Sequence, residues 1–328
     1  MAASIQMYSG LKKLLVISLL FTNIYSTDGQ DWNYQDLGPD MWSETYPMCA
    51  GTSQSPIIIK TACTTYRTFA PFRFSSDYNL TYNFTLLNNG HTITSTYNSN
   101  GSTPFTLSGG GLNGTFQFLN FHVHWDENSK SGSEHQVNEV KYTGEIHFVH
   151  QNPETGQIAV LGIFMHSSQL SSDGIDNTAN KTIKEWAKYF TTAVELGSVN
   201  ESTELSLNLA TLMGNNLNDF WRYGGSLTTP PCTEDAVWTV FTAPIVISEE
   251  EIDSFRKNIF SENDRSPQPL YYRIVYRNFL NETLSAIPDY NCCSDESNNA
   301  DNKVILSKPI KYFSILSTTF VLLNILNT

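Results

Sequence analysis

The middle of the chain is a succession of short apolar-rich runs separated by turn residues, a pattern that favours a large β-sheet protein. The runs cover residues 82–87, 92–97, 116–125, 145–150 and 158–165. Asn89-Gly90 and Gly109-Gly110-Gly111 are turn-forming sequences between them. Helical patterns are confined to residues 181–193 and 248–260, where Ser248 and Glu251 have the spacing of a capping box. The sequence therefore predicts a mostly β fold with peripheral short helices.

The composition is that of a folded, acidic domain. Of the 328 residues, 40% are hydrophobic and 16% are charged, so the chain can bury a core and does not resemble a disordered segment. The net charge of −13 argues against a nucleic-acid partner, because binding to phosphates needs clustered Lys and Arg. No repeat or linker divides residues 30–288, which we expect to form one domain.

Both ends of the chain resemble targeting signals. Residues 1–26 join Lys12 and Lys13 to an apolar run and then to small polar residues, as in a secretory signal peptide. Residues 289–311 form a polar spacer and residues 312–328 an apolar tail, which is typical of a glycosylphosphatidylinositol (GPI) attachment signal. A membrane span and the absence of any anchor are the alternatives, because the tail is shorter than the roughly 20 residues that cross a bilayer. Candidate attachment residues are Ser294, Ser297, Asn298 and Asn299.

Glycosylation motifs and cysteines indicate the same compartment. Asn-x-Ser/Thr triplets, which accept N-linked sugars, begin at Asn79, Asn83, Asn100, Asn113, Asn180, Asn200 and Asn281. Five cysteines predict one or two disulfides in an oxidising environment, and their odd number leaves at least one thiol outside intrachain pairs. We therefore expect the protein at the extracellular face of the plasma membrane, held by a GPI anchor, or secreted.

Three histidines on two of the predicted strands suggest a metal site. His122 and His124 are two residues apart, so on a strand both imidazoles point to the same face. His147 lies in the next run, and the polar segment between the runs can return the chain antiparallel. Three histidines with an open fourth position are typical of catalytic zinc. A His-x-His pair on a strand also occurs by chance, so these residues alone leave a metal site and ordinary strand histidines as equal alternatives.

Four motifs in a fixed order carry a family resemblance. They are Phe-His-Val-His-Trp at 121–125, Gly-Ser-Glu-His-Gln at 132–136, Glu-Ile-His-Phe-Val at 145–149 and Ser-Leu-Thr-Thr-Pro-Pro-Cys at 226–232. With shorter matches at 53–57, 159–164 and 268–270, residues 31–285 resemble the α-class carbonic anhydrases, and among them the secreted and GPI-anchored members. The resemblance implies a single domain with a large, mainly antiparallel twisted sheet of about ten strands. It also implies a carbonate dehydratase, a zinc lyase that converts carbon dioxide and water into bicarbonate and a proton.

The resemblance also implies roles for residues around the metal. The residues that correspond to the Zn²⁺ ligands are His122, His124 and His147. Thr228 corresponds to a residue that orients the nucleophile and donates its own hydroxyl proton to Glu134, which as a carboxylate can only accept. His91 corresponds to the proton shuttle, a role that suits an imidazole because it titrates near neutral pH.

The implied substrate site is an apolar wall with polar groups beside it. Its residues are Val149, Val160, Leu227 and Trp238, together with Thr228 and Thr229. Glu145 is expected to accept a hydrogen bond from His147 and so orient that ring. Asn120 departs from the family, which usually has the longer Gln there. We expect Asn120 to reach the His122 ring poorly or through a water, with weaker zinc binding or a small change in rate.

Cys49 and Cys232 correspond to the disulfide of the secreted and membrane-bound family members, which would brace the loop that carries Thr228. The pairing of Cys63, Cys292 and Cys293 is left open, as is the oligomeric state. The alternative function is a catalytically silent, carbonic-anhydrase-like extracellular binding module. Such proteins typically lose zinc histidines, whereas all three are present in this chain.

Overall fold

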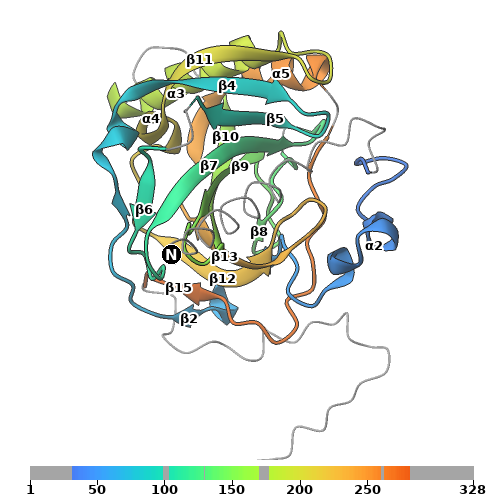
Figure 1. Ribbon diagram of the computed structural model, residues 1–328, viewed down its shortest axis with the longest axis vertical. Coiled ribbons are helices and arrows are strands. Elements are labelled where there is room, and N and C mark those ends of the chain that lie inside the picture. The colour runs from blue at the N-terminus through green and yellow to red at the C-terminus, as the bar shows by residue number, and fades with distance from the viewer. Residues whose placement is uncertain (1–31, 99–102, 129, 170–176, 260–261, 281–328) are drawn as a thin grey trace, which may run out of the picture. The chain divides into compact units, whose positions relative to one another are not determined.

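The computed structural model describes residues 32–98, 103–128, 130–169, 177–259 and 262–280 (Figure 1). The chain divides into two units, Met1–Cys292 and Cys293–Thr328, and all described residues belong to the first. The segments interpreted as signal peptide, spacer and tail lie outside the described residues. So do Asn100, Asn281, Cys292, Cys293 and the side chain of Asn180.

A single large sheet dominates the described part of the chain, as the strand pattern predicts (Figure 1). It has 13 strands, ten of which follow one continuous order, β11-β4-β5-β7-β9-β10-β13-β12-β15-β2. The strands are β2 (Thr65–Tyr66), β3 (Arg73–Phe74), β4 (Thr81–Asn88), β5 (Ile93–Tyr97), β6 (Thr106–Ser108), β7 (Phe116–Trp125), β9 (Gly144–Gln151), β10 (Ile158–Ser168), β11 (Ser202–Asn208), β12 (Phe220–Ser226), β13 (Glu234–Phe241), β14 (Ile245–Ser248) and β15 (Tyr276–Arg277). A separate two-stranded sheet pairs β1 (Ile58–Ile59) with β8 (Gln136–Val137).

Most neighbouring strands in the large sheet run antiparallel. The parallel pairs are β10 with β13, β10 with β14, and β15 with β2. All five predicted runs form strands, and the run at residues 116–125 has the bounds of β7. The predicted turns are also present: Gly109 has φ +74°, and a Cβ there would meet the carbonyl oxygen of Pro71 at 2.2 Å. Only glycine fits that turn without strain.

The helices are short and few in the described residues. They are α2 (Trp42–Thr45), α3 (Asn177–Ala193), α4 (Leu209–Met213) and α5 (Glu249–Asn258), with single 3₁₀ turns at Pro47–Ala50, Thr61–Cys63 and Ser76–Asn79. None of the helices in this part of the chain is long and apolar enough to cross a bilayer.

The two predicted helices are present, with differences at their starts. α3 ends at Ala193 as expected but begins earlier, at Asn177. α5 follows Ser248, yet the Ser248 side chain makes no capping hydrogen bond, so the predicted capping box is wrong. Ser248 is the last residue of β14, paired there with Ser168, and it has extended backbone geometry. Three glutamates in the first turn of α5 instead place negative charge at the positive end of the helix.

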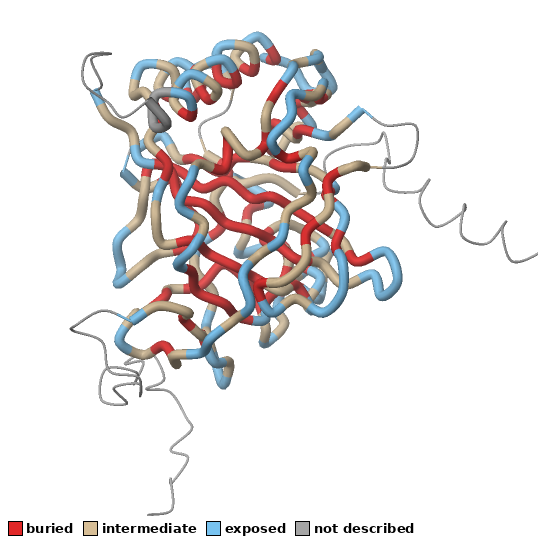
Figure 2. Tube along the Cα trace, turned by 90° about the vertical axis from the view of Figure 1, so that its left-hand side faces the viewer, coloured by how far each residue is buried: buried red, intermediate tan, exposed pale blue. Residues whose placement is uncertain are grey.

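Many residues of the sheet strands are buried (Figure 2), and they pack into apolar clusters on both faces of the sheet. One face forms the larger core, where Phe121 packs against Trp186 and Tyr189 of α3. The opposite face forms a smaller apolar cluster that includes Val149, Val160 and Trp238. Successive side chains of β9 and β10 point alternately to these two faces.

A β-bulge on β7 decides which face its histidines occupy. Phe116 and Phe118 belong to the larger core, and so do Phe121, Val123 and Trp125, so the alternation changes phase between Phe118 and Phe121. The pairing of β7 with β9 shifts register at the same place, between Phe118 and Asn120. Such a bulge re-aims the side chains that follow it. Without it, His122 and His124 would point into the larger core.

Candidate metal centre and active site

His122, His124 and His147 come together on the smaller-core side of the sheet. His122 and His147 are directly paired across β7 and β9, which run antiparallel as the sequence predicts. His124 is two residues beyond His122 on the same face. One nitrogen from each ring lies within 4.8 Å of the other two. Tetrahedral zinc with Zn–N distances of about 2.0–2.1 Å requires nitrogens roughly 3.4 Å apart, which lies within this limit.

Each ring has an outer hydrogen bond that leaves one nitrogen directed inward. Nδ1 of His122 donates to Oδ1 of Asn120 at 3.0 Å, and Nδ1 of His124 donates to the carbonyl oxygen of Asn263 at 2.7 Å. Nε2 of His147 donates to Oε1 of Glu145 at 3.0 Å. Metal-binding histidines show this arrangement, because the outer bond fixes the tautomer and the ring orientation. The direct bond from Asn120 shows that our expectation of poor reach at this position was wrong.

The electrostatics of the cluster also suit a cation. Burial lowers the pKa of His124 to about 4, and burial and the neighbouring rings hold the pKa of His122 well below its ordinary value. The rings are therefore neutral, as metal ligands must be. Nε2 of His124 is buried and has no hydrogen-bond partner. A buried polar atom without a partner is costly, and a metal ion would satisfy it. These residues fit zinc.

A second cluster beside the first is a hydrogen-bond network. His135 and Glu145, with His147, also lie within 4.8 Å of one another. Nδ1 of His135 donates to Oε1 of Glu145 at 2.7 Å, and Nε2 of His135 lies 2.7 Å from the hydroxyl of Tyr223. Burial opposes the charge on Glu145, but His135 and His147 outweigh it and hold the pKa of Glu145 well below its ordinary value. A charged Glu145 is therefore available to orient His147.

Glu134 is fully buried beside two of the three histidines. Its Oε1 accepts a hydrogen bond from the backbone N–H of Arg265 at 2.9 Å and lies 3.5 Å from Nδ1 of His124, while its Oε2 lies 3.8 Å from Nδ1 of His147. Burial raises the pKa of Glu134 to about 7, against the lowering effects of His147, the Arg265 N–H and the Thr228 side chain. Oε2 makes no hydrogen bond of standard geometry. The Thr228 side chain is nevertheless close enough to lower the pKa of Glu134. Thr228 and Glu134 are therefore neighbours, as their predicted roles require.

The predicted apolar wall stands next to His147. Val149, Val160 and Trp238 are cross-strand neighbours on β9, β10 and β13, and all are buried. The Trp238 ring centroid is 4.8 Å from that of His147. Leu227 and Thr229, on the loop after β12, are half-buried, whereas Thr228 between them is buried. The wall therefore meets the metal cluster at His147.

His91 lies on the turn between β4 and β5 and stacks on Trp32. The two ring centroids are 3.5 Å apart with an interplanar angle of 6°. Oδ1 of Asn89 accepts from the backbone N–H groups of His91 and Thr92, which fixes the turn. Burial lowers the pKa of His91 to about 4, and its Nδ1 has no hydrogen-bond partner.

A disulfide joins Cys49 to Cys232, as the resemblance implies. The backbone N–H of Cys232 donates to the carbonyl of Thr229, so the bridge is attached directly to the loop that carries Thr228. On the other side, Arg265 donates to the carbonyl of Cys49 at 3.0 Å. The bridge thus ties the N-terminal part of the domain to the candidate site.

Sequence reasoning missed three residues of the site: Trp32, Asn263 and Arg265. Each acts through contacts with residues far away in the chain. The bond from His124 to Asn263 spans 139 positions. Residues 262–270 have no regular secondary structure, so no periodicity marks them. No local signal in the sequence could have identified them.

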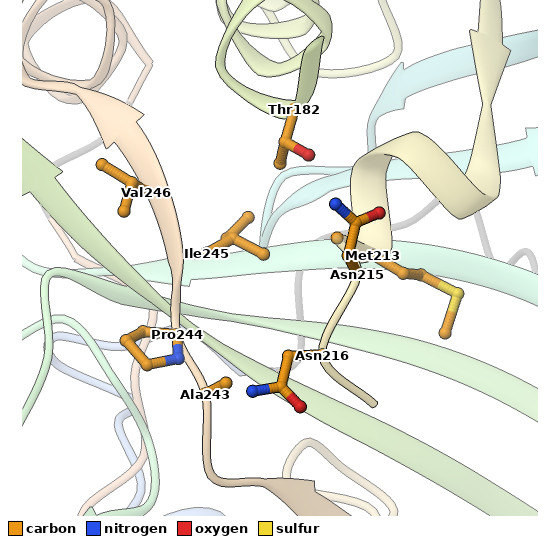
Figure 3. A pocket seen from close by; sticks show the side chains of 9 residues that line it. Thr182, Met213, Asn215, Asn216, Ala243, Pro244, Ile245 and Val246 are labelled. Atoms are coloured by element: carbon orange, nitrogen blue, oxygen red, sulfur yellow. The ribbon is translucent and has the colours of Figure 1, made fainter. Parts of the chain in front are cut away.

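A hollow that is lined by no histidine lies between α4 and β14 (Figure 3). Its volume is about 170 Å³. It is lined by Thr182, Met213, Gly214, Asn215, Asn216, Ala243, Pro244, Ile245 and Val246. Its lining contains no His, Cys, Asp, Glu, Lys or Arg, and its polar side chains are those of Thr182, Asn215 and Asn216.

Comparison with known proteins agrees with this geometry. Residues 37–279 match the family model of the eukaryotic-type carbonic anhydrases. The chain belongs to this family. It is 33% identical over 233 residues to putative carbonic anhydrase 3 of Caenorhabditis elegans, covering 69% of this chain and 86% of that protein. It is 31% identical over 278 residues to carbonic anhydrase 3 of Equus caballus, covering 76% of this chain and 99% of that protein. It is 29% identical over 279 residues to carbonic anhydrase 7 of Homo sapiens, covering 77% of this chain and 99% of that protein.

The segment that matches the carbonic anhydrase family contains the three histidines of the metal cluster, Glu134, Thr228, His91 and the apolar wall, whereas Trp32 lies before it. Both cysteines of the disulfide also lie inside it. The segments interpreted as signal peptide, spacer and tail lie outside it.

Proposed function

We propose that this protein is a zinc enzyme that reversibly hydrates carbon dioxide to bicarbonate and a proton. The observation that carries the proposal is the convergence of three neutral histidines, each with one nitrogen directed inward and the other held by an outer acceptor. Family membership supports the same reaction. When bound, zinc would supply Lewis acidity and make water a nucleophile at neutral pH.

The residues around the cluster would position the two reactants. Thr228 accepts a hydrogen bond from the nucleophile if its own proton is directed to Glu134, and Glu134 enforces that direction in its charged form because it then has no proton to donate. Burial raises the pKa of Glu134 to about 7, and a zinc ion bound beside it would favour the charged form. Val149, Val160 and Trp238 offer carbon dioxide a dry surface, which suits a small substrate that has no charge to bind. The product bicarbonate is charged and gains nothing from that surface, which favours its release.

The proton must leave a buried site, and His91 is the group proposed to export it. Its turn leads directly into the start of β5, the neighbour of β7 in the sheet. A ring stacked on Trp32 with a pKa of about 4 is a weak proton acceptor at neutral pH. We therefore infer that export uses a ring position turned away from Trp32, where water restores the ordinary pKa.

Stopped-flow measurement of carbon dioxide hydration tests the function. The zinc-loaded protein should be active, and removal of the metal with a chelator should abolish the activity. His124→Ala should have the same effect, whereas His166→Ala, an exposed histidine on β10, should not. A folded, zinc-loaded protein without activity would contradict the proposal and favour a silent extracellular binding module.

We further propose that the protein acts outside the cell, on a GPI anchor. The support is the targeting-like pattern at both ends, the Cys49–Cys232 bridge, and four exposed glycosylation motifs at Asn79, Asn83, Asn113 and Asn200. Phosphatidylinositol-specific phospholipase C should release the protein from intact cells. Retention on the membrane after this treatment would indicate a membrane span, and protein found only in the medium would indicate secretion.

A further inference from the structure

The edge of β7 beyond its last pair with β5 is occupied by Asn263. The final β5–β7 pair is Thr94 with His122, so the residues of β7 after His122 have no strand partner on that side. Asn263 takes this place. Its backbone N–H donates to the carbonyl of Trp125 at 3.0 Å, and its Oδ1 accepts from the N–H of Trp125 at 2.7 Å. A single fully buried residue thus continues the sheet.

The same residue binds the metal ligand strand and the His91 turn at once. Its carbonyl accepts from Nδ1 of His124 at 2.7 Å. Its side-chain Nδ2 donates to the carbonyl of Val123 at 2.9 Å and to the carbonyl of His91 at 3.2 Å. Every polar atom of Asn263 is therefore used, and the amide group joins the zinc-ligand strand to the His91 turn.

We propose that Asn263 is a positioning residue that fixes the His91 turn relative to the zinc-ligand strand, a role that rests on the proposed function of His91 in proton export. Few other hydrogen bonds link this turn to β7. Thr92 contributes one, from its hydroxyl to the same Val123 carbonyl at 2.9 Å. The His91 carbonyl itself is held by the Asn263 amide. Loss of this amide should let the turn and the ring it carries move, although the metal ligands stay in place.

The test removes the amide in two ways. Asn263→Ala deletes all three side-chain hydrogen bonds. Asn263→Asp keeps the shape and the acceptor for Trp125 N–H but loses the amide hydrogens, and it serves if the alanine variant does not fold. Asn152→Ala is the matched control, because Asn152 is also buried and makes three side-chain bonds, to Glu154, Thr155 and Asn113, in a turn after β9.

The first readout is the NMR signal of the His91 Cε1–H, identified by its absence in His91→Ala. Stacking on Trp32 shifts this signal upfield through the ring current. We expect the Asn263 variants to move it downfield, and the Asn152 control to leave it unchanged. This readout needs no catalytic activity. It therefore remains valid if the wild-type protein fails to hydrate carbon dioxide, a result that would count against the proposed function alone.

The second readout separates proton transfer from the chemical step. In weak buffer, kcat of the Asn263 variants should fall by about tenfold, because a loosened turn no longer holds the His91 ring, in any of its orientations, at a fixed distance from the zinc-ligand strand. This loss is a part of the ~10²–10⁴-fold that a positioned proton acceptor contributes. Imidazole should restore it, and kcat/KM should stay unchanged. Unchanged His91 signals and unchanged kcat, with a lowered Tm like that of the control, would overturn the proposal. Loss of zinc with an unmoved His91 signal would also overturn it.

Discussion

Nδ1 of His122 donates a hydrogen bond to Oδ1 of Asn120, two residues earlier on β7, over 3.0 Å. The family usually has the longer Gln at this position, and a shorter side chain would be expected to fall short. The β-bulge between Phe118 and Asn120 offers the physical reason that it does not, since a bulge bends the strand and re-aims the residue beside it.

Removal of this acceptor should weaken zinc binding. Asn120→Ala leaves the His122 ring free to rotate, and loss of such an outer partner typically costs about 10–100-fold in metal affinity. Asn120→Gln should also bind zinc less tightly than the wild type, because the extra methylene must be accommodated where the bond is already made. Competition with a chromogenic chelator measures both. Gln117→Ala, exposed on the same strand, is the control and should not change the affinity.

Trp32→Ala should raise the pKa of His91. Burial is the cause of its lowered pKa of about 4, and the stacked Trp32 ring provides part of that burial. Exposure of the imidazole to water favours its charged form, so the pKa should move towards the ordinary value of 6.5. NMR titration of the His91 ring measures the shift. Tyr272→Ala, which removes an aromatic ring that is 95% exposed, should leave the titration unchanged.

The pH dependence of stability should include a contribution from Asp264. Burial raises the pKa of Asp264 to about 6, although its ion pair with Lys141 at 2.5 Å opposes the shift. Because the folded-state pKa lies above the unfolded value, this contribution to stability is fully present below about pH 4 and is lost as the pH rises through about 6.

Comparison with Asp264→Asn isolates this contribution. The free energy of unfolding of the wild type, relative to the variant, should fall between pH 4 and pH 7 by at most about 3 kcal/mol, at roughly 1.36 kcal/mol per pKa unit. Urea unfolding at several pH values measures it. A difference that stays constant, or that grows with pH, would show that the carboxyl titrates at or below its ordinary pKa.

The sequence predicted the parts of the site that rest on local alternation. His122 and His124 share a face because they are two residues apart, and His147 lies opposite because β7 and β9 run antiparallel. The bulge was missed, although its trace is present: the apolar residues of β7 change phase between Phe118 and Phe121. A change of phase within one strand is thus a usable sign of a bulge.

The contacts of Trp32 and Asn263 were beyond prediction from local patterns. The chain between Asn263 and His124 includes six strands of the main sheet, and their contact depends on how the entire sheet is assembled. At Ser248 the local pattern predicted a contact that the structure does not have. Its spacing to Glu251 fitted a capping box, but pairing with Ser168 holds it in β14 and the side chain makes no cap.

Loss of the Cys49–Cys232 bridge should lower both stability and activity. The bridge closes a loop of 183 residues, so its removal increases the conformational entropy of the unfolded chain and should cost about 2–5 kcal/mol. Activity should fall as well, because the Cys232 N–H bonds to Thr229 and the Cys49 carbonyl bonds to Arg265, whose N–H in turn holds Glu134.

Calorimetry and hydration assays of the Cys49→Ser/Cys232→Ser double variant check both effects. Reducing agent should reproduce them in the wild type and add little in the double variant. A double variant with normal stability but reduced activity would limit the bridge to a role in positioning the Thr228 loop.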